Sequence, residues 1–473
     1  MDLQHLRPSQ EQGVPLYLQL YRRYREAIAA GKLRPGDRVP SVRNLASELT
    51  LARGTVEMAY QMLANEGYFV TRGAAGTIIS PRLESLAADH AKLSEPPAPA
   101  SPALHAISSE VLPFQLGLPA LDAFPRKTWS RLAGRTMRSL QTTAMTYPDP
   151  AGYEPLRRAI ATYLGISRGI ACSPEQVFVT TGYLGALELV CHALLKTGDL
   201  GWYEDPGYIL ARQFLERTGM RLEPVPVDEE GLNVAAGQRR APHARFAVVT
   251  PTHQSPLGVA LSLPRRLELL EWANHRQAWI IEDDYDSEFR YHGRPLPALK
   301  SLDRDGRVLY TGTFSKVLFP GLRLAYLVVP VSQIGQFRDA VNHRSGSGSI
   351  LPQAMVADFM EQGHFGRHLR KMRALYATRR GYLVDALKQE MGEHLYIQPQ
   401  AGGIHVLAHL RTEQNDRALA EAAQTSGLAV HALSDWQMCK SSQGGLLMGF
   451  ANFATAEEAR ASVQRLKAVL GEY

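Results

Sequence analysis

The apolar positions near the start of the chain recur every three or four residues, the spacing of one face of an α-helix. The pattern predicts a first helix over residues 15–30, a second short helix capped by Ser41, and a third over 53–65 that ends at Gly67. A break with two prolines and a glycine, LRPGDRVPS, separates the first two. The residues that share a face are Leu16, Leu20, Tyr24 and Ile28 in the first helix, Val42, Leu45, Ala46 and Leu49 in the second, and Val56, Ala59, Tyr60 and Leu63 in the third.

Two short β-prone segments follow the third helix. Residues 68–71 and 77–80 flank the glycine-containing turn RGAAG and predict a hairpin. Three helices and a hairpin predict a winged helix-turn-helix, an α+β domain that places its third helix in the major groove of DNA. Arg53 and Thr55, at the start of that helix, are then expected to face the DNA. A helical bundle that binds protein is the alternative reading.

The pattern changes in the rest of the chain. Residues 82–112 are rich in Pro, Ala and Ser without a sustained apolar period, which is typical of a linker. Beyond them, the apolar runs QVFVTTG, FAVVTPT, AWIIEDD and RVLYTGT alternate with helix-length segments. That order predicts a large α/β domain with a mostly parallel sheet and helices on both faces. We therefore expect a DNA-binding domain over residues 1–81, a linker over 82–112 and a second domain over 113–473.

Composition and charge restrict the class of protein. The chain has no run of about 18 apolar residues and no apolar signal segment at its start. Its three cysteines show no metal-ligand spacing, so a reducing, cytoplasmic location is expected. Residues 1–82 hold eleven Lys and Arg against seven Asp and Glu, an excess that is two-thirds of the net charge of +6. A basic terminal domain favours a polyanionic partner such as DNA.

Ligands of parallel α/β sheets gather at the carboxyl ends of the strands, and candidate binding groups occur there in this sequence. TTGYLGALELV follows a predicted strand and opens a helix, so the backbone N–H groups of Gly182, Tyr183 and Leu184 would face an anion. In EDPGY, Tyr208 follows a proline-glycine bend, where an aromatic ring would stack on a flat ligand. The alternative for Tyr208 is an ordinary core tyrosine.

A cluster of acidic residues stands at the end of the predicted strand AWIIEDD, in the segment IIEDDYDSEFRY. Asp283 is placed to pair with a protonated pyridine nitrogen, and Tyr285, on the same face, to donate a hydrogen bond to a ring oxygen. The alternatives are a metal cluster or a solvated acidic loop. No histidine lies among these carboxylates, which disfavours a metal.

The segment TGTFSKVLFPGLRLAY supplies the covalent chemistry. Lys316 lies in a small-residue turn after an apolar run, Thr313 and Ser315 offer hydroxyls, and Arg323 offers a guanidinium fork. An amine for an aldehyde, together with hydroxyls and a guanidinium for a phosphate, is the donor set that pyridoxal 5'-phosphate (PLP) requires. The order of the motifs along the chain agrees with that cofactor.

Two resemblances follow from these motifs. GKLRPGDRVPSVRNLASELTLARGTVEMAYQMLANEGYF resembles the GntR family of bacterial regulators, and residues 114–473 resemble a fold type I aminotransferase. The whole chain resembles the MocR/GabR subfamily of PLP-dependent transcriptional regulators, which implies a head-to-tail homodimer. For DNA, the resemblance implies contacts from Arg43, Arg53, Thr55, Arg72 and Gly76. For PLP, it implies an internal aldimine on Lys316, Asp283 at the ring nitrogen, Tyr285 at the ring oxygen, Tyr208 stacking, and Arg323 with Thr313 at the phosphate.

The sequence departs from aminotransferases at two places. Their usual Asn-Pro near the ring oxygen is Ser255-Pro256 here. Their substrate-carboxylate arginine falls at Leu447, and no arginine occurs between Arg417 and Arg460. We therefore expect a regulator that senses PLP or an amine effector through the lysine aldimine, with little or no turnover. The rivals are a working aminotransferase with an accessory DNA-binding domain and a pure PLP sensor.

Overall fold

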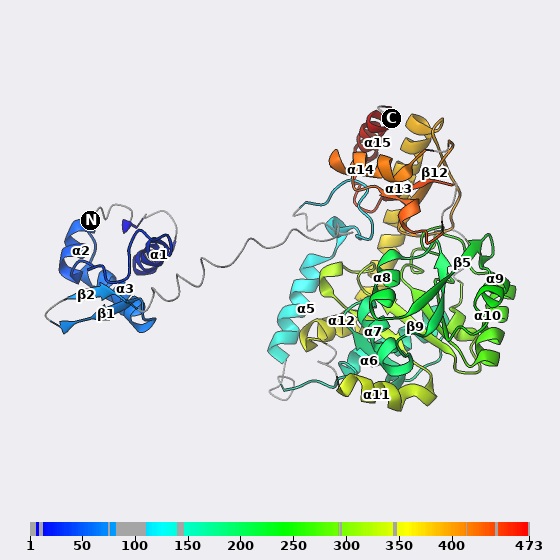
Figure 1. Cartoon of the computed structure of the whole chain (residues 1–473), viewed down its shortest axis with the longest axis horizontal. Coiled ribbons are helices and arrows are strands. Elements are labelled where there is room, and N and C mark those ends of the chain that lie inside the picture. The colour runs from blue at the N-terminus through cyan, green and yellow to red at the C-terminus, as the bar shows by residue number, and fades with distance from the viewer. Residues whose placement is uncertain are drawn as a thin grey trace. The chain divides into compact units, whose positions relative to one another are not determined.

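The computed structural model describes residues 6–8, 13–73, 76–81, 110–139, 146–291, 293, 296–343, 348–412, 414–439 and 443–471. The chain divides into two compact units, Met1–Ile107 and Ser108–Tyr473 (Figure 1). Most of the expected linker, residues 82–109, lies outside the described residues, so the bounds of 82–112 stay a prediction. Among the described residues, no helix is long and apolar enough to cross a membrane.

The smaller unit is a winged helix-turn-helix, as the sequence predicted. Its three helices pack around a core in which the rings of Tyr24, Tyr60 and Phe69 meet edge to face, with centroids 5.0 to 5.8 Å apart. The Ser41 side chain accepts a hydrogen bond from the backbone N–H of Asn44 and so caps the second helix. The elements are α1 (Leu16–Ala29), α2 (Val42–Leu49), α3 (Arg53–Asn65), and the antiparallel strands β1 (Phe69–Thr71) and β2 (Thr77–Ile79).

The larger unit is built on an eight-stranded mixed sheet with the order β3-β10-β9-β8-β7-β4-β5-β6. The central strands are parallel, whereas β10 runs antiparallel to both of its neighbours. The mostly parallel sheet is therefore confirmed, with two reversals that the sequence did not indicate, because β6 also runs antiparallel to β5. The strands are β3 (Val177–Thr180), β4 (Leu200–Asp205), β5 (Arg221–Asp228), β6 (Gly231–Leu232), β7 (Phe246–Val249), β8 (Trp279–Asp284), β9 (Val308–Thr313) and β10 (Ala325–Val328).

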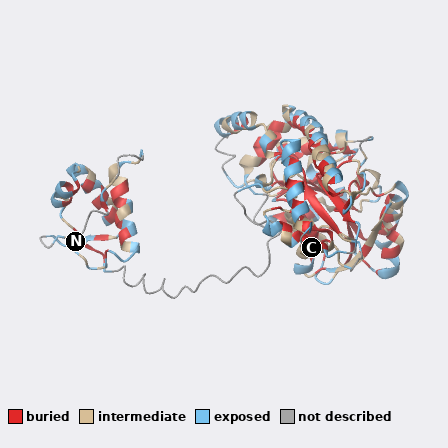
Figure 2. Ribbon diagram, turned by 90° about the horizontal axis from the view of Figure 1, so that it is seen from above, coloured by how far each residue is buried: buried red, intermediate tan, exposed pale blue. Residues whose placement is uncertain are grey.

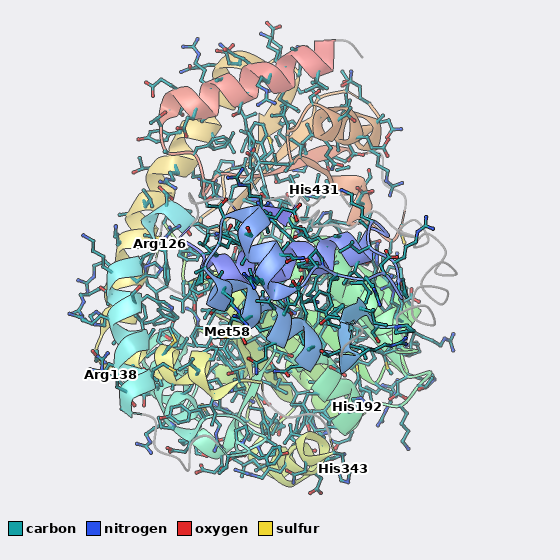
Figure 3. The ribbon with its side chains drawn as sticks, turned by 90° about the vertical axis from the view of Figure 1, so that its left-hand side faces the viewer. Met58, Arg126, Arg138, His192, His343 and His431 are labelled. Atoms are coloured by element: carbon teal, nitrogen blue, oxygen red, sulfur yellow. The ribbon has the colours of Figure 1, made fainter. Side chains whose placement is uncertain are left out.

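Helices cover both faces of this sheet because neighbouring strand residues point to opposite faces. Ile280 and Val308 pack with α10, whereas Ile281 and Leu309 pack with α7 and α11. Figure 2 shows the buried strands between helices with exposed outer sides. Arg126 and Arg138 mark the two ends of α5 (Figure 3). The helices that surround the sheet are α5 (Arg126–Ser139), α6 (Glu154–Arg168), α7 (Tyr183–Leu194), α8 (Ile209–Arg217), α9 (Val234–Arg240), α10 (Leu263–Arg276), α11 (Ile334–Asn342) and α12 (Ile350–Glu361).

A second, four-stranded sheet near the C-terminus has the order β11-β12-β14-β13. One face packs on α13 and α15, and Leu407 lies opposite Leu447 on the other face. The segment before α5 joins this sheet, because the N–H of Gly449 donates to the carbonyl of Phe114 at 2.7 Å. The elements are β11 (Leu395–Ile397), β12 (His405–Leu410), β13 (His431–Ala432), β14 (Gly445–Gly449), α13 (His364–Met391), α14 (Asp416–Thr425) and α15 (Ala456–Gly471).

Candidate functional site

Strand alternation decides which carboxylate of β8 faces the candidate site. Glu282 and Asp284 share one face, where Asp284 pairs with the Arg168 guanidinium at 3.0 Å. Asp283 points to the opposite face, toward the Tyr183 side chain at the start of α7. Of these three acids, Asp283 is the one that reaches the carboxyl edge beside α7.

Asp283 is buried and forms no ion pair among the described residues. Burial, reinforced by the neighbouring carboxylates of Asp284 and Glu204, raises the pKa of Asp283 to about 8. A buried carboxylate without a cation is costly, and a protonated ring nitrogen would relieve that cost. The residue therefore fits the pyridine nitrogen of PLP.

Lys316 lies in the connection between β9 and the reversed strand β10. Thr313 pairs with Ala325 across these strands, so the whole turn is held at the carboxyl edge of the sheet. The Lys316 Nζ donates a hydrogen bond to the carbonyl of Gly117 at 2.9 Å. A Cβ at Gly117 would lie 2.5 Å from Nζ, so glycine is required there for this approach. Gly117 was not identified from the sequence.

The Lys316 amine should react at a lower pH than an ordinary lysine. Burial lowers its pKa to about 8, against the opposing effect of the Asp286 and Asp283 carboxylates. The unprotonated amine is the reactive form. We expect the rate at which the apo protein captures PLP to rise about tenfold per pH unit below that pKa and to level off above it. Stopped-flow absorbance measures this rate, and a rise that continues toward pH 10 would contradict the assignment.

The N-terminus of α7 has the features of an anion-binding site. Gly182 has a φ of +91°, and a Cβ on it would lie 3.5 Å from the Arg323 guanidinium. Arg323 itself donates to the carbonyl of Thr181 at 3.3 Å. The first N–H groups of a helix have no intrahelical partner, so those of Gly182, Tyr183 and Leu184 are available to a phosphate.

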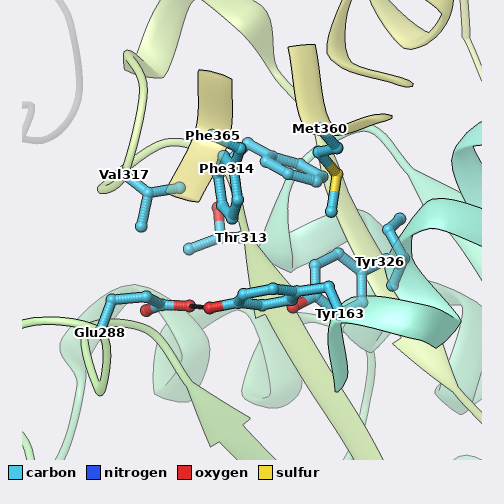
Figure 4. Close-up of a pocket in the computed structure, with 9 residues that line it drawn as sticks. Tyr163, Glu288, Thr313, Phe314, Val317, Tyr326, Met360 and Phe365 are labelled. Atoms are coloured by element: carbon cyan, nitrogen blue, oxygen red, sulfur yellow. Dashed lines mark hydrogen bonds between the residues drawn. The ribbon is translucent and has the colours of Figure 1, made fainter. Parts of the chain in front are cut away.

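Thr313 and Ser315 lie beside the N-terminus of α7, at the start of the turn that carries Lys316. The Ser315 N–H donates to the Thr313 hydroxyl at 3.1 Å. Figure 4 shows a hollow lined by Thr313, Tyr163 and Glu288. In it the Tyr163 hydroxyl donates a hydrogen bond to a Glu288 carboxylate oxygen at 3.0 Å. The two hydroxyls and the guanidinium that the sequence assigned to a phosphate thus come from one continuous turn.

Tyr285 lies among polar groups on the other side of the site. Burial raises the pKa of Tyr285, and the nearby Ser255 side chain opposes that rise. The His253 Nδ1 lies 3.0 Å from both the Tyr285 hydroxyl and an Asp286 carboxylate oxygen. A proton on Nδ1 would be donated to Asp286, which leaves the Tyr285 O–H free to reach a ring oxygen. His253 and Asp286 were missed, although the histidine stands two residues before Ser255.

Tyr208 caps the start of α8, with its ring 6.3 Å from that of Tyr183 and 5.7 Å from that of Trp436. Trp436 comes from the C-terminal sheet region, and its carbonyl accepts the Gly207 N–H at 3.0 Å. The predicted stacking residue therefore lies where two parts of the larger unit meet. The Trp436 contact was not identified from the sequence.

Leu447 lies on β14 in an apolar cluster, and its own side chain is fully buried. We call this cluster the apolar wall, and it packs beside Tyr208. The strand position at which the sequence lacked an arginine is thus filled with hydrocarbon. The residues of the apolar wall are Leu116, Leu257, Leu407, Leu433, Trp436 and Leu447.

The predicted DNA contacts lie on the exterior of the smaller unit. Arg43 and Arg53 are exposed in the first turns of α2 and α3, and Thr55 is half-buried. The N–H of Arg72 donates to the carbonyl of Gly76 at 2.8 Å and closes the wing turn. These residues occupy the parts of the fold that the sequence assigned to them, and their contacts with DNA stay a prediction.

Known proteins resemble both units. The family model for gntR-family bacterial regulatory proteins matches residues 16–79, and that for class I and II aminotransferases matches residues 120–443. The probable rhizopine catabolism regulatory protein MocR of Rhizobium meliloti is 37% identical over 93% of this chain and 90% of its own length. The pyridoxine biosynthesis regulator PdxR of Corynebacterium glutamicum is 32% identical over 94% of each chain.

Solved structures resemble the larger unit. The α-aminoadipate aminotransferase LysN of Thermus thermophilus has a TM-score of 0.69 at 29% identity, over 76% of this chain and 92% of its own. The kynurenine aminotransferase of Pyrococcus horikoshii has a TM-score of 0.70 at 25% identity, over 87% and 99%. PLP is accordingly the cofactor expected of this unit. The chain belongs to the MocR-type regulators of the GntR family, which join a helix-turn-helix to an aminotransferase-like domain.

Proposed function

We propose that this chain regulates transcription by binding DNA in a way that depends on PLP, or on an amine effector, at Lys316. The observation that carries the proposal is a half-buried lysine of lowered pKa in the same site as Asp283, a carboxylate without an ion pair among the described residues, in a chain that also contains a winged helix-turn-helix. An amine and an acid held this way suit a covalent sensor of carbonyl and amine chemistry.

Each side chain of the site has a defined task in this proposal. When bound, PLP supplies an aldehyde with which different amines can condense in turn. Lys316 provides the resident amine, Asp283 holds a proton at the ring nitrogen, and Tyr285 with Ser255 donates at the ring oxygen. Tyr208 covers one face of the ring and excludes water. The phosphate groups are Gly182, Tyr183, Leu184, Thr313, Ser315 and Arg323.

The smaller unit provides the DNA contacts. Arg53 enters the major groove at the start of α3, and Thr55 contacts the DNA backbone there. Arg43 binds backbone phosphate or a base from α2, and Arg72 with Gly76 lies at the tip of the wing. Binding is expected to weaken as salt rises, because phosphate contacts release counterions. A role on DNA supports a cytoplasmic location.

The two units are coupled through the assembly in this proposal. The family resemblance favours a head-to-tail homodimer, in which each DNA-binding unit rests on the aminotransferase-like unit of the other subunit. A ligand changes DNA affinity only if it binds two arrangements of the dimer with different affinity. The apolar wall supports sensing with little or no turnover, since Leu447 stands at the strand position where aminotransferases carry the arginine for the substrate carboxylate.

A mobility-shift assay on the DNA that flanks the gene tests the proposal. We expect PLP or an added amine to change the apparent Kd by about 5- to 150-fold, the usual range of allosteric coupling. A response to PLP alone would select the pure PLP sensor. Steady turnover of an amino acid with a keto acid would select the aminotransferase. A Kd that none of these ligands alters would refute regulation through this site.

A further inference from the structure

We propose that Arg380 binds the carboxylate of an amine effector, in place of the arginine that β14 lacks at Leu447. The inference rests on the proposed function, in which PLP is held at Lys316. It adds a residue that determines specificity and the chemical class of the effector, a primary amine that also carries a carboxylate.

Arg380 lies on α13 and is half-buried. Its Nε is buried and has no hydrogen-bond partner, and its guanidinium forms no hydrogen bond or ion pair within the part of the chain that the structure describes. Burial lowers the pKa of Arg380, because a guanidinium that leaves water loses hydration that no described residue replaces. A carboxylate would supply both the opposite charge and the missing acceptors.

Other arginines of the larger unit show how a structural guanidinium is held. Arg379, the residue before Arg380, donates to both carboxylate oxygens of Asp122, at 3.0 and 2.5 Å. Arg212 donates to two backbone carbonyls, at 3.0 and 3.3 Å, in the segment that carries Trp436. The fold uses both of these side chains, whereas among the described residues it makes no use of the Arg380 donors.

The face of α13 that carries Arg380 packs toward the lysine site. One turn before Arg380, the Tyr376 hydroxyl accepts a hydrogen bond from the N–H of Ala120 at 2.9 Å. Ala120 lies three residues after Gly117, whose carbonyl accepts the Lys316 Nζ hydrogen bond at 2.9 Å. Residues one turn apart share a helix face, so Arg380 lies on the same side of α13 as Tyr376.

Tyr291 and His405 place the Arg380 guanidinium beside the lysine site. Besides burial, the charges of Arg380 and of the Asp286 carboxylate both act on the pKa of each of these two rings. Asp286 is in turn one of the two carboxylates that act against burial on the pKa of Lys316. The same two side chains are therefore close to Arg380 on one side and to the surroundings of the lysine amine on the other.

Neither of these neighbours supplies an anion. Burial raises the pKa of Tyr291, and its hydroxyl donates to the Gly403 carbonyl at 2.6 Å. Burial lowers the pKa of His405 to about 4, so its ring is neutral. The Asp286 carboxylate is already engaged, with an oxygen 3.0 Å from the His253 Nδ1. The guanidinium therefore has room in its electrostatic surroundings for one more negative charge.

An effector bound at Arg380 by its carboxylate presents its amine to the PLP held at Lys316. In the exchange, one C–N bond forms between the aldehyde carbon and the incoming amine, and the bond to the Lys316 Nζ breaks. One proton passes from the incoming ammonium to Nζ, so atoms and charge balance. The carboxylate takes no part in this exchange, so its contact with Arg380 adds affinity and selectivity alone.

Matched ligands test this class on the wild-type protein loaded with PLP. Each set is an amine and the same amine with a carboxylate at one end or the other: ethylamine with alanine and β-alanine, and butylamine with norvaline and δ-aminovalerate. The absorbance band is titrated and the apparent Kd compared within each set. We expect a carboxylated member to bind at least about tenfold more tightly than its parent amine, because a guanidinium–carboxylate pair is a strong contact. If no carboxylated member does so, the inference is wrong.

Substitution of Arg380 gives a second test. We expect Arg380→Gln to weaken binding of the preferred carboxylated ligand at least about tenfold, while the apparent Kd of its parent amine stays within about twofold. A purely structural role of Arg380 would change both values. Arg380→Lys keeps a positive charge without the planar fork and should restore part of the preference.

Arg290 provides the matched control. It is also half-buried, with a buried Nε that lacks a partner among the described residues, but its guanidinium lies 3.4 Å from where a Cβ on Gly293 would stand. Arg290→Gln should keep the wild-type preference. Thermal unfolding checks each variant, and if Arg380→Gln does not fold, the wild-type ligand sets and Arg380→Lys decide.

Three results would overturn the inference. They are an Arg380→Gln protein that folds and keeps the full preference, an equal loss of preference in Arg290→Gln, and a band that no ligand in the sets perturbs. The absence of any band before ligand is added would instead refute the proposed function, so the two failures are distinguishable.

Discussion

Lys316→Ala is expected to eliminate the visible absorbance band of lysine-bound PLP and, with it, the effect of PLP or amines on DNA binding. The reason is chemical, because alanine has no amine to hold the aldehyde, whereas the phosphate and ring contacts remain. Residual binding would therefore be noncovalent and reversible by dialysis. Absorbance after reconstitution and a mobility-shift titration measure the two losses on the same preparation.

A control variant and a stability argument separate this loss from damage to the fold. Lys127, exposed on α5, offers the same change of residue away from the site, and Lys127→Ala should keep the full band. Removing the Nζ hydrogen bond to Gly117 costs about 1 kcal/mol of unfolding free energy, so Lys316→Ala should still fold. Normal regulation by Lys316→Ala would exclude covalent sensing.

Local signals explain why the helices of the smaller unit were predictable. Helix α3 runs from Arg53 to Asn65, the bounds expected from its apolar period and from Gly67. The buried residues Val56 and Leu63 belong to the predicted stripe. Such features depend on residues within one or two turns, so a sequence window contains them. The prediction that Asp283 and Tyr285 share one face followed in the same way, from the alternation of side chains along a strand.

Long-range contacts explain what the sequence did not reveal. The reversal of β10 depends on its pairing with β3 and β9, and nothing in AYLV specifies the direction of the neighbouring strands. The Gly117 carbonyl lies 199 residues before the lysine it contacts. Trp436 reaches Tyr208 from the C-terminal part of the chain. The sequence thus identified residues whose chemistry is distinctive, whereas their partners were missed because backbone groups and apolar rings are common everywhere.

Arg53→Ala is expected to abolish specific DNA binding while leaving the PLP band unchanged. Arg53 is exposed at the first position of α3, and its side chain forms no ion pair within the described residues, so the fold does not need it. Loss of one base contact costs about 1–3 kcal/mol, which lowers affinity about 5- to 150-fold at that position. Footprinting on the flanking DNA, at fixed salt, measures the loss.

An arginine on the same unit gives the matched control. Arg22 is exposed on α1, away from the predicted contacts, and Arg22→Ala should keep the wild-type footprint, with at most a smaller salt dependence. The pair distinguishes readout by α3 from attraction by the basic unit as a whole. If both variants weaken binding equally, the unit acts through its net charge. If Arg53→Ala footprints like the wild type, α3 is not the recognition helix.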